Sequence, residues 1–124
     1  MAVERQWLQS WFEGTPVRIE QRSAASFSVS VPRSYCFDPG ASQVLPPLAA
    51  LLEKVAQSLK RQPDARLLLV AAPADAGAAP ALALQRAEAV RRQLVAQGVP
   101  AGRLAPASAG DGAVVLLRVG FATP

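Results

Sequence analysis

The stretch ARLLLVAAPADAGAAPALALQRAEAVRRQLVAQG, Ala65–Gly98, decides the fold of this chain. Its apolar run over 67–72 is short enough to be a strand that is buried on both faces. Pro80 stands where a helix tolerates proline, because the first helical residue needs no N–H partner. One apolar helical face follows, formed by Ala83, Ala87, Val90 and Leu94. The stretch therefore predicts a strand, a loop and a helix that stops at Gly98.

Residues 46–61 carry the clearest helical pattern in the chain. One apolar stripe is formed by Leu48, Leu52, Val55 and Leu59. Two prolines suit the first turn, and the basic pair 60–61 suits the last turn, because cations are favoured at the carboxyl end of a helix. We therefore expect a helix of about four turns directly before the strand of the first stretch.

Two strands are predicted before these helices. Apolar residues alternate over 17–21 and again over 27–31, and Ser23-Ala24-Ala25 between them suits a hairpin connection. Pro32 either ends the second strand or confines it to a sheet edge. Asp38-Pro39-Gly40 then has the composition of a tight turn.

Two further strands are predicted near the carboxyl end, a weak one over 103–107 and a strong one over 113–121, with a turn at 110–112. The main elements then follow in the order β, α, β, α, β, β. Helices of this length between strands favour an α/β two-layer sandwich with the helices on one face of a mixed sheet.

The first residues predict an additional helix over 3–13. Its apolar residues fall on one side and are Val3, Trp7, Leu8 and Trp11. Such a helix either covers the core as a flap or offers Trp7 and Trp11 to a partner or a membrane surface. We divide the chain into an extension, residues 1–24, with this helix and a hairpin strand, and a domain over 25–124.

Composition limits the environment and the partners of the protein. The 124 residues suffice for a single hydrophobic core, and no apolar run is long enough to span a bilayer. The first twenty residues show no export signal, so the chain is either cytoplasmic or a fragment that has lost one. The net charge of +4 comes from scattered arginines without interleaved aromatic residues, which argues against a nucleic-acid partner.

Composition also argues against catalysis and bound cofactors. The chain has no histidine and one cysteine, Cys36, so a zinc or redox-metal site is not expected. A catalytic thiol would need a histidine, so Cys36 is predicted to be a small buried residue. No two carboxylates lie together in a recognisable loop, so we predict no enzyme activity and no cofactor.

Three stretches of the chain carry a family resemblance. They are CFDPGASQVLPPLAALLEKVAQSL over 36–59, LALQRAEAVRRQLVAQGVPAGRL over 82–104 and LLRVGF over 116–121. Together they resemble the OmpA-like carboxy-terminal domain, which is shared by outer-membrane porin tails, peptidoglycan-associated lipoproteins and flagellar stator subunits. The resemblance covers about three-quarters of the chain and implies the two-layer fold already predicted.

The resemblance implies non-covalent binding to peptidoglycan in the periplasm, within the bacterial cell envelope. In the family, an aspartate before the second helix and an arginine early in that helix hold the diaminopimelate of a stem peptide. Asp75 and Arg86 take these places here, Asp75 for the ammonium and Arg86 for the carboxylate. A planar guanidinium suits a carboxylate, and a helix amino terminus adds positive partial charge.

The loop before this helix departs from the family pattern. The family's glycine-histidine-threonine-aspartate, followed by a glycine and an asparagine, is replaced by Ala71-Ala72-Pro73-Ala74-Asp75-Ala76-Gly77, and the loop is shortened. If the loops are aligned by their acid, Asp75 precedes Arg86 by eleven residues. If they are aligned by Gly77, Ala74 falls at the aspartate position and no acid is left. The candidate ligand-binding residues are Asp75, Arg86, Ala74 and Gly77.

Two functions of different class stay open. The domain either binds peptidoglycan, which requires the guanidinium of Arg86 to face an accessible hollow, or it is a protein–protein interaction module in an envelope assembly, with Trp7 and Trp11 as the partner surface. Purely structural roles are also open. Asp75 could cap a helix or a loop amide, and Arg86 could pair with Glu53, Asp75 or a carbonyl.

Overall fold

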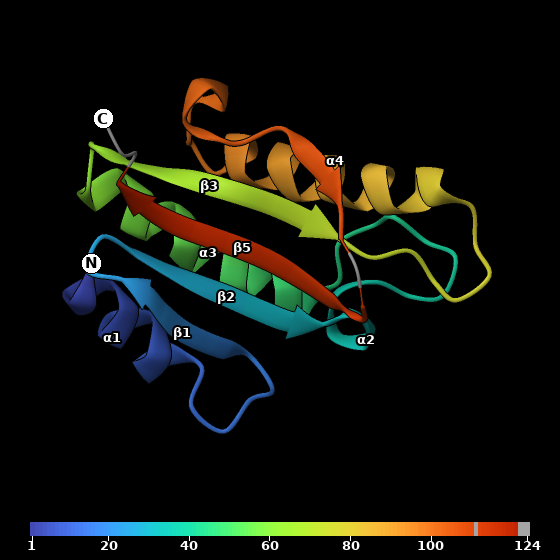
Figure 1. The fold of residues 1–124 in the computed structure, drawn as a ribbon, viewed down its shortest axis with the longest axis horizontal. Helices are drawn as coiled ribbons and strands as arrows, with labels where there is room; N and C mark the ends of the chain where they lie inside the picture. Colours follow the sequence, from blue (N-terminus) through green and yellow to red (C-terminus); the bar gives the residue numbers. More distant parts are fainter. Residues whose placement is uncertain (111, 122–124) are drawn as a thin grey trace.

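The computed structural model describes residues 1–110 and 112–121. Its elements are, in chain order, α1 (Ala2–Trp11), β1 (Arg18–Ser23), β2 (Ser26–Pro32), α2 (Arg33–Cys36), α3 (Pro46–Arg61), β3 (Ala65–Ala72), α4 (Pro80–Ala96), the 3-10 helix η1 (Ala101–Arg103), β4 (Ala107–Ala109) and β5 (Val114–Phe121). The predicted order of the main strands and helices is confirmed, and the short helix α2 is an addition to it (Figure 1).

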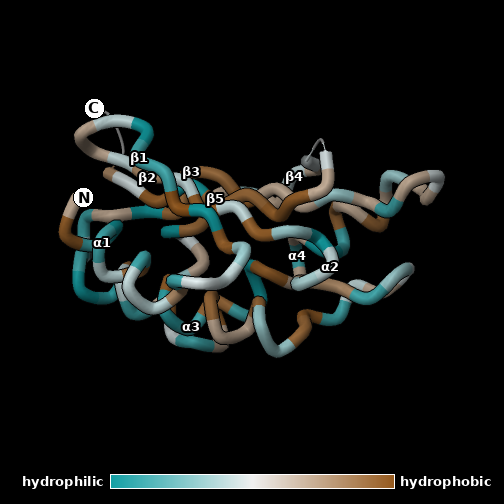
Figure 2. The backbone as a smooth tube through the Cα atoms, turned by 90° about the horizontal axis from the view of Figure 1, so that it is seen from below, coloured by the Kyte–Doolittle hydropathy of each residue, from teal (hydrophilic) through white to brown (hydrophobic). Residues whose placement is uncertain are grey.

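The strands form one mixed sheet in the order β1-β2-β5-β3-β4. Only β4 runs parallel to its neighbour β3, whereas the other neighbours are antiparallel. The last strand, β5, lies between β2 and β3 and joins the two halves of the sheet (Figure 1). Seen edge-on, the sheet forms one layer with α1 and α3 on the same side of it (Figure 2). The predicted two-layer sandwich is therefore confirmed.

The core lies between the helices and one face of the sheet. Helix α3 buries its predicted leucine stripe, and α4 buries its predicted face, including Val90 and Leu94. The sheet contributes Phe27, Val29, Val31, Val115, Leu117 and Val119. Each buried leucine contributes roughly 1.5–3 kcal/mol by transfer from water. Gly98 has a φ of 96° and ends α4 as predicted, because glycine adopts this conformation without strain.

The prediction that the strand over 67–72 is buried on both faces is wrong for its first half. In β3 the exposed residues Arg66 and Leu68 alternate with the buried Ala65 and Leu67. Helices cover only one face of the sheet, so alternate side chains meet solvent. The burial becomes continuous only at the end of the strand, over Val70–Ala72.

The predicted strand over 103–107 is also wrong in its position. Arg103 lies in the 3-10 helix η1, and the strand β4 is only Ala107–Ala109. The guanidinium of Arg103 donates to the carbonyls of Leu59, Gln62 and Ala65, at 2.6–3.1 Å. These bonds satisfy carbonyls at the end of α3 and hold Arg103 out of the sheet. The turn predicted at 110–112 includes Asp111, which lies outside the described residues.

The predicted hairpin is confirmed, since Ser23 pairs with Ser26. Pro32 is the last residue of β2, so it ends the strand rather than marking a sheet edge. Within the described residues, the structure contains no helix with the length and apolarity required to cross a membrane.

Helix α1 packs on the domain through a different face from the one predicted. Leu8 is fully buried and Trp7 packs half-buried against the core, but Val3 and Trp11 are 75% and 54% exposed. The inward position next to Leu8 is held by Glu4. Its carboxylate accepts hydrogen bonds from the side chains of Arg61 at 2.6 Å, Ser58 at 2.7 Å and Gln62 at 3.4 Å. The division at residue 24 stays a prediction.

Candidate functional site

Two loops and the first turns of α4 meet at one end of the sheet. The first loop follows α2 and contains the predicted turn, in which the amide of Ala41 donates to the carbonyl of Asp38 at 3.0 Å and Gly40 has a φ of 73°. The second loop joins β3 to α4 and carries Asp75. Arg86 reaches both loops from α4.

Arg86 is the largest fully buried side chain of the described residues, and it is fully engaged with its own fold. Its Nε donates to the carbonyl of Ala41 at 2.8 Å, and its Nη2 donates to the carbonyl of Asp38 at 3.2 Å. Its Nη1 donates to the carbonyl of Pro73 at 3.1 Å and to Asp75 Oδ1 at 2.9 Å. One guanidinium therefore holds both loops against α4.

Asp75 completes this arrangement from the second loop. Its Oδ2 accepts the backbone amide of Gly40 at 2.6 Å, and Arg33 Nε lies 3.5 Å from its Oδ1. The hydrogen bond from Arg86, then that from the Gly40 amide and the nearby charge of Arg33, lower the pKa of the Asp75 carboxyl below its ordinary value. Asp75 is therefore an ionised carboxylate near neutral pH.

The structure does not place the guanidinium of Arg86 against an accessible hollow. The sequence anticipated its carbonyl and Asp75 partners among several alternatives, and the structure selects these two over Glu53. Asp75 likewise binds a loop amide, as one alternative predicted. The Arg86 side chain is completely buried, so it has no solvent-facing N–H group that could donate to a ligand carboxylate.

The other two candidate residues shape the second loop. Ala74 is half-buried beside Asp75, and Gly77 is exposed with a φ of 78°. The amide of Ala78 donates to the carbonyl of Asp75 at 3.0 Å, which closes a turn around Gly77. Glycine is suited to this position because its positive φ is unfavourable for other residues.

A hollow of 230 Å³ opens beside Asp75. It is lined by Arg33, Ser34, Phe37, Asp38, Pro39 and Asp75. The side chains of Arg33 and Asp75 are 36% and 21% exposed, so a cation and a carboxylate both reach this hollow. Sequence reasoning missed Arg33, because it follows a strand end without any motif and meets Asp75 only in the folded chain.

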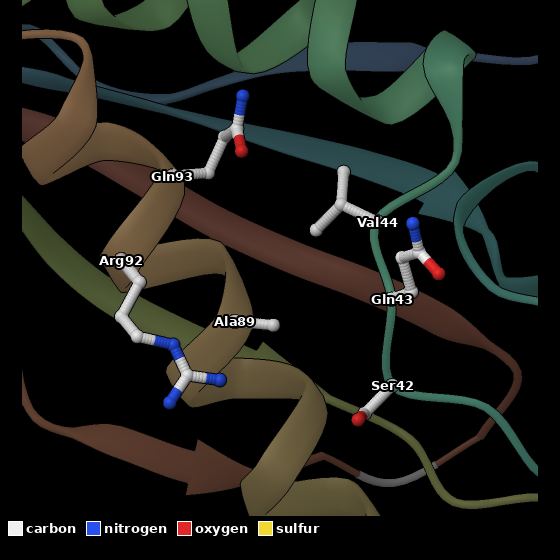
Figure 3. Close-up of a pocket in the computed structure, with 6 residues that line it drawn as sticks. All are labelled: Ser42, Gln43, Val44, Ala89, Arg92 and Gln93. Carbon is white, nitrogen blue, oxygen red and sulfur yellow. The ribbon is translucent and has the colours of Figure 1, made fainter.

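A second cleft, of 450 Å³, lies between α4 and the segment leading into α3 (Figure 3). We call it the glutamine cleft, and it is lined by Ser42, Gln43, Val44, Ala89, Arg92 and Gln93. Glu88 and Arg92 are four positions apart in α4, a spacing at which opposite charges often pair. The structure instead pairs Glu88 with Arg91 at 3.1 Å, so Arg92 is left to line the cleft.

Cys36 is fully buried, as predicted for a small core residue. Its thiol lies 3.4 Å from the carbonyl of Pro32. Burial raises the pKa of the Cys36 thiol to about 12. The thiolate that nucleophilic chemistry requires is therefore scarce at neutral pH.

The fold and this site define a two-layer α/β domain whose loops are tied together by a buried arginine and an aspartate. Residues 36–116 match the sequence model of the OmpA family, and the chain belongs to that family. No curated protein matches the chain in sequence.

Several solved structures share the fold over most of their length. A putative MotB-like protein from Desulfovibrio vulgaris has a TM-score of 0.77 at 14% identity, covering 98% of this chain and 92% of its own. The cell wall anchor of the T6SS from Pseudomonas aeruginosa has a TM-score of 0.71 at 16% identity, and the match covers 95% of this chain and 96% of the anchor structure. The peptidoglycan-associated lipoprotein from Burkholderia pseudomallei has a TM-score of 0.54 at 27% identity, and the match covers 74% of this chain and 86% of the lipoprotein structure.

Proposed function

We propose that this chain is a non-catalytic domain of the bacterial cell envelope that binds peptidoglycan non-covalently, through the diaminopimelate of a stem peptide held beside Asp75. Membership of the OmpA family supports the proposal. So does the likeness to a peptidoglycan-associated lipoprotein and to a cell wall anchor. A location in the periplasm is part of the same proposal.

One observation carries this proposal. The carboxylate of Asp75 lies 2.9 Å from the buried guanidinium of Arg86 and also lines an open hollow of 230 Å³. Arg86 keeps this carboxylate charged and fixed without entering the hollow. Preorganised charge of this kind favours ligand binding, because little ordering is left for the binding step.

The end of a diaminopimelate side chain carries one ammonium and one carboxylate. Asp75 and Asp38 both line the hollow and offer carboxylates for the ammonium. Arg33 is the cation that lines the hollow, so in this proposal it takes the ligand carboxylate, and Arg86 acts as a positioning residue. This assignment replaces the direct contact between Arg86 and the ligand expected from the resemblance.

A second candidate function is a protein–protein interaction module of an envelope assembly that does not bind the wall. The burial of Arg86 favours it, since the family arginine has no exposed donor here. The altered loop favours it as well, because the family's histidine, threonine and asparagine have no counterparts. In this reading Trp7 and Trp11 form the partner surface.

The two functions are separated by a titration of isotope-labelled protein with a diaminopimelate muropeptide, followed by backbone amide shifts. Binding at the proposed site shifts the amides of 33–40 and 72–78, and Asp75→Asn abolishes these shifts. The matched control is Asp64→Asn, which alters an exposed aspartate at the far end of β3. If millimolar muropeptide leaves the wild-type spectrum unchanged, the interaction module is the surviving function.

A further inference from the structure

The glutamine cleft shares no lining residue with the hollow beside Asp75. One wall is α4, which contributes Ala89, Arg92 and Gln93, and the other is the extended segment 42–44. Ala89 and Ser42 point toward each other across the cleft (Figure 3). Its volume of 450 Å³ lies in the range of small-ligand sites.

The polar side chains of this cleft are unused by the fold. Within residues 1–110 and 112–121, the side chains of Ser42, Gln43, Arg92 and Gln93 make no hydrogen bond to the protein. The neighbouring Arg91, by contrast, is held by Glu88 at 3.1 Å. Free donors and acceptors that line one concave surface are a mark of a binding site.

Both walls are held in place independently of any ligand. Ala41, at one end of the segment, is fixed by Arg86 Nε at 2.8 Å. Leu45, at the other end, donates its amide to the carbonyl of Cys36 at 2.9 Å. Helix α4 is anchored by Val90 and Leu94, which are fully buried. The cleft is therefore preformed, which lowers the cost of ordering it on binding.

The lining selects a class of ligand. Each glutamine carboxamide offers a donor and an acceptor, as a peptide group does, and Arg92 offers a cation for a carboxylate. Val44 and Ala89 offer a small apolar surface to a methyl-sized side chain. The described lining holds neither a carboxylate for a cation nor an aromatic ring on which a base could stack.

We propose that the glutamine cleft is a binding site for the carboxyl end of a short peptide with small apolar side chains. Arg92 contacts the terminal carboxylate, Gln43 and Gln93 bind the backbone amides, and Val44 and Ala89 contact the side chain. This site does not depend on the stem-peptide site, so it is tested separately from the proposed function.

The test is a titration of labelled wild-type protein with N-acetyl-D-alanyl-D-alanine, its L enantiomer and its carboxyl amide. The free acid shifts the amides of 42–44 and 89–93 in a saturable way. Arg92→Gln weakens this binding about two- to fivefold, as expected for an exposed ion pair, and the matched control Arg91→Gln leaves it unchanged. Preference for the D form assigns the ligand to peptidoglycan, and equal binding assigns it to protein carboxyl termini.

The contact between Arg92 and the ligand carboxylate is isolated by combining Arg92→Gln with the carboxyl amide of the ligand. The carboxyl amide binds wild-type protein more weakly than the acid by the same factor, and Arg92→Gln binds the two equally, because the interaction is then missing on both sides. Unchanged amides at 42–44 and 89–93 under millimolar acid would overturn the proposal. Equal binding of acid and amide by the wild type would overturn it as well.

Discussion

The Nη1 atom of Arg86 lies 2.9 Å from Oδ1 of Asp75, and no part of the arginine side chain reaches solvent. The same guanidinium binds the carbonyls of Asp38, Ala41 and Pro73. A residue that resembles a ligand contact in sequence is therefore an internal support in the structure, and it lines neither the hollow beside Asp75 nor the glutamine cleft.

Replacing Arg86 is expected to destabilise the fold. Arg86→Ala removes the guanidinium donor from three carbonyls and one carboxylate, which costs about 3–5 kcal/mol of unfolding free energy, as for other broken buried pairs. Urea unfolding followed by tryptophan fluorescence measures this loss. The control is Arg92→Ala in the same helix, expected to stay within about 0.5 kcal/mol of wild type. Equal stability of the two variants would contradict the supporting role of Arg86.

The stability of the protein is expected to depend on Asp75 in acid. The pKa of its carboxyl is lowered in the folded state, first by the hydrogen bond from Arg86. A carboxyl of this kind stabilises the fold above its unfolded pKa of about 4, and the contribution is lost as the pH falls through the lower folded value. Unfolding free energy measured between neutral and acid pH should fall more steeply for wild type than for Asp75→Asn. If the unfolding free energy falls equally with pH in the two proteins, the ionisation of Asp75 does not stabilise the fold.

Arg33→Gln tests which arginine meets the ligand. We expect it to weaken binding of the diaminopimelate muropeptide while leaving the unfolding free energy within about 0.5 kcal/mol of wild type, because Arg33 is partly exposed. A muropeptide whose distal carboxylate is amidated should bind wild type and Arg33→Gln equally. Calorimetry measures both affinities, and Arg18→Gln, on the exposed side of β1, is the control. If Arg33→Gln binds the muropeptide with the affinity of wild type, a group other than Arg33 contacts the ligand carboxylate.

Gly120 is required by a close approach of two strands. A Cβ at this position would lie 2.5 Å from the carbonyl oxygen of Ala25 and 2.6 Å from the Cβ of Ser26. Gly120→Ala is therefore expected to cost roughly 1–3 kcal/mol of unfolding free energy through overpacking. Gly102→Ala is the matched control, since nothing lies within 4 Å of the added atom. Chemical denaturation of both variants checks the difference.

Cys36 is expected to resist alkylation in the folded protein. Its pKa of about 12 leaves about a thousandfold less thiolate near pH 8 than an ordinary thiol provides. Burial adds a steric barrier. Iodoacetamide labelling followed by mass spectrometry should therefore be slow in buffer and fast in concentrated urea. Fast labelling of the folded protein would show that the strand end around Pro32 opens readily.

Local sequence signals predicted the parts of the fold that local interactions determine. The helix over 46–61 was marked by its own leucine stripe and its prolines, and it was found with those bounds. The strand over 67–72 was marked by its apolar run, but the exposure of Arg66 and Leu68 depends on which sheet face the helices leave open. Which face stays exposed depends on how the whole chain packs, so the few residues of the strand cannot predict it.

The site was less predictable for the same reason. The sequence predicts a strand at Arg103, but its guanidinium binds carbonyls near the end of α3, about forty positions away in sequence. Arg86 was placed correctly in α4, but its burial depends on loop carbonyls that lie far away in sequence. Arg33 enters the hollow only because α2 brings it beside Asp75. Charged side chains with distant backbone partners have no periodic signature.

The buried carboxylate of Glu4 bears on where this chain can be cut. A truncation that starts at residue 25 would remove the acceptor of Ser58 and Arg61, uncover the core packed under Leu8, and turn β2 into a bare sheet edge. Shorter versions prepared for crystallisation or fusion should therefore keep α1 and β1, although the OmpA family match begins only at residue 36.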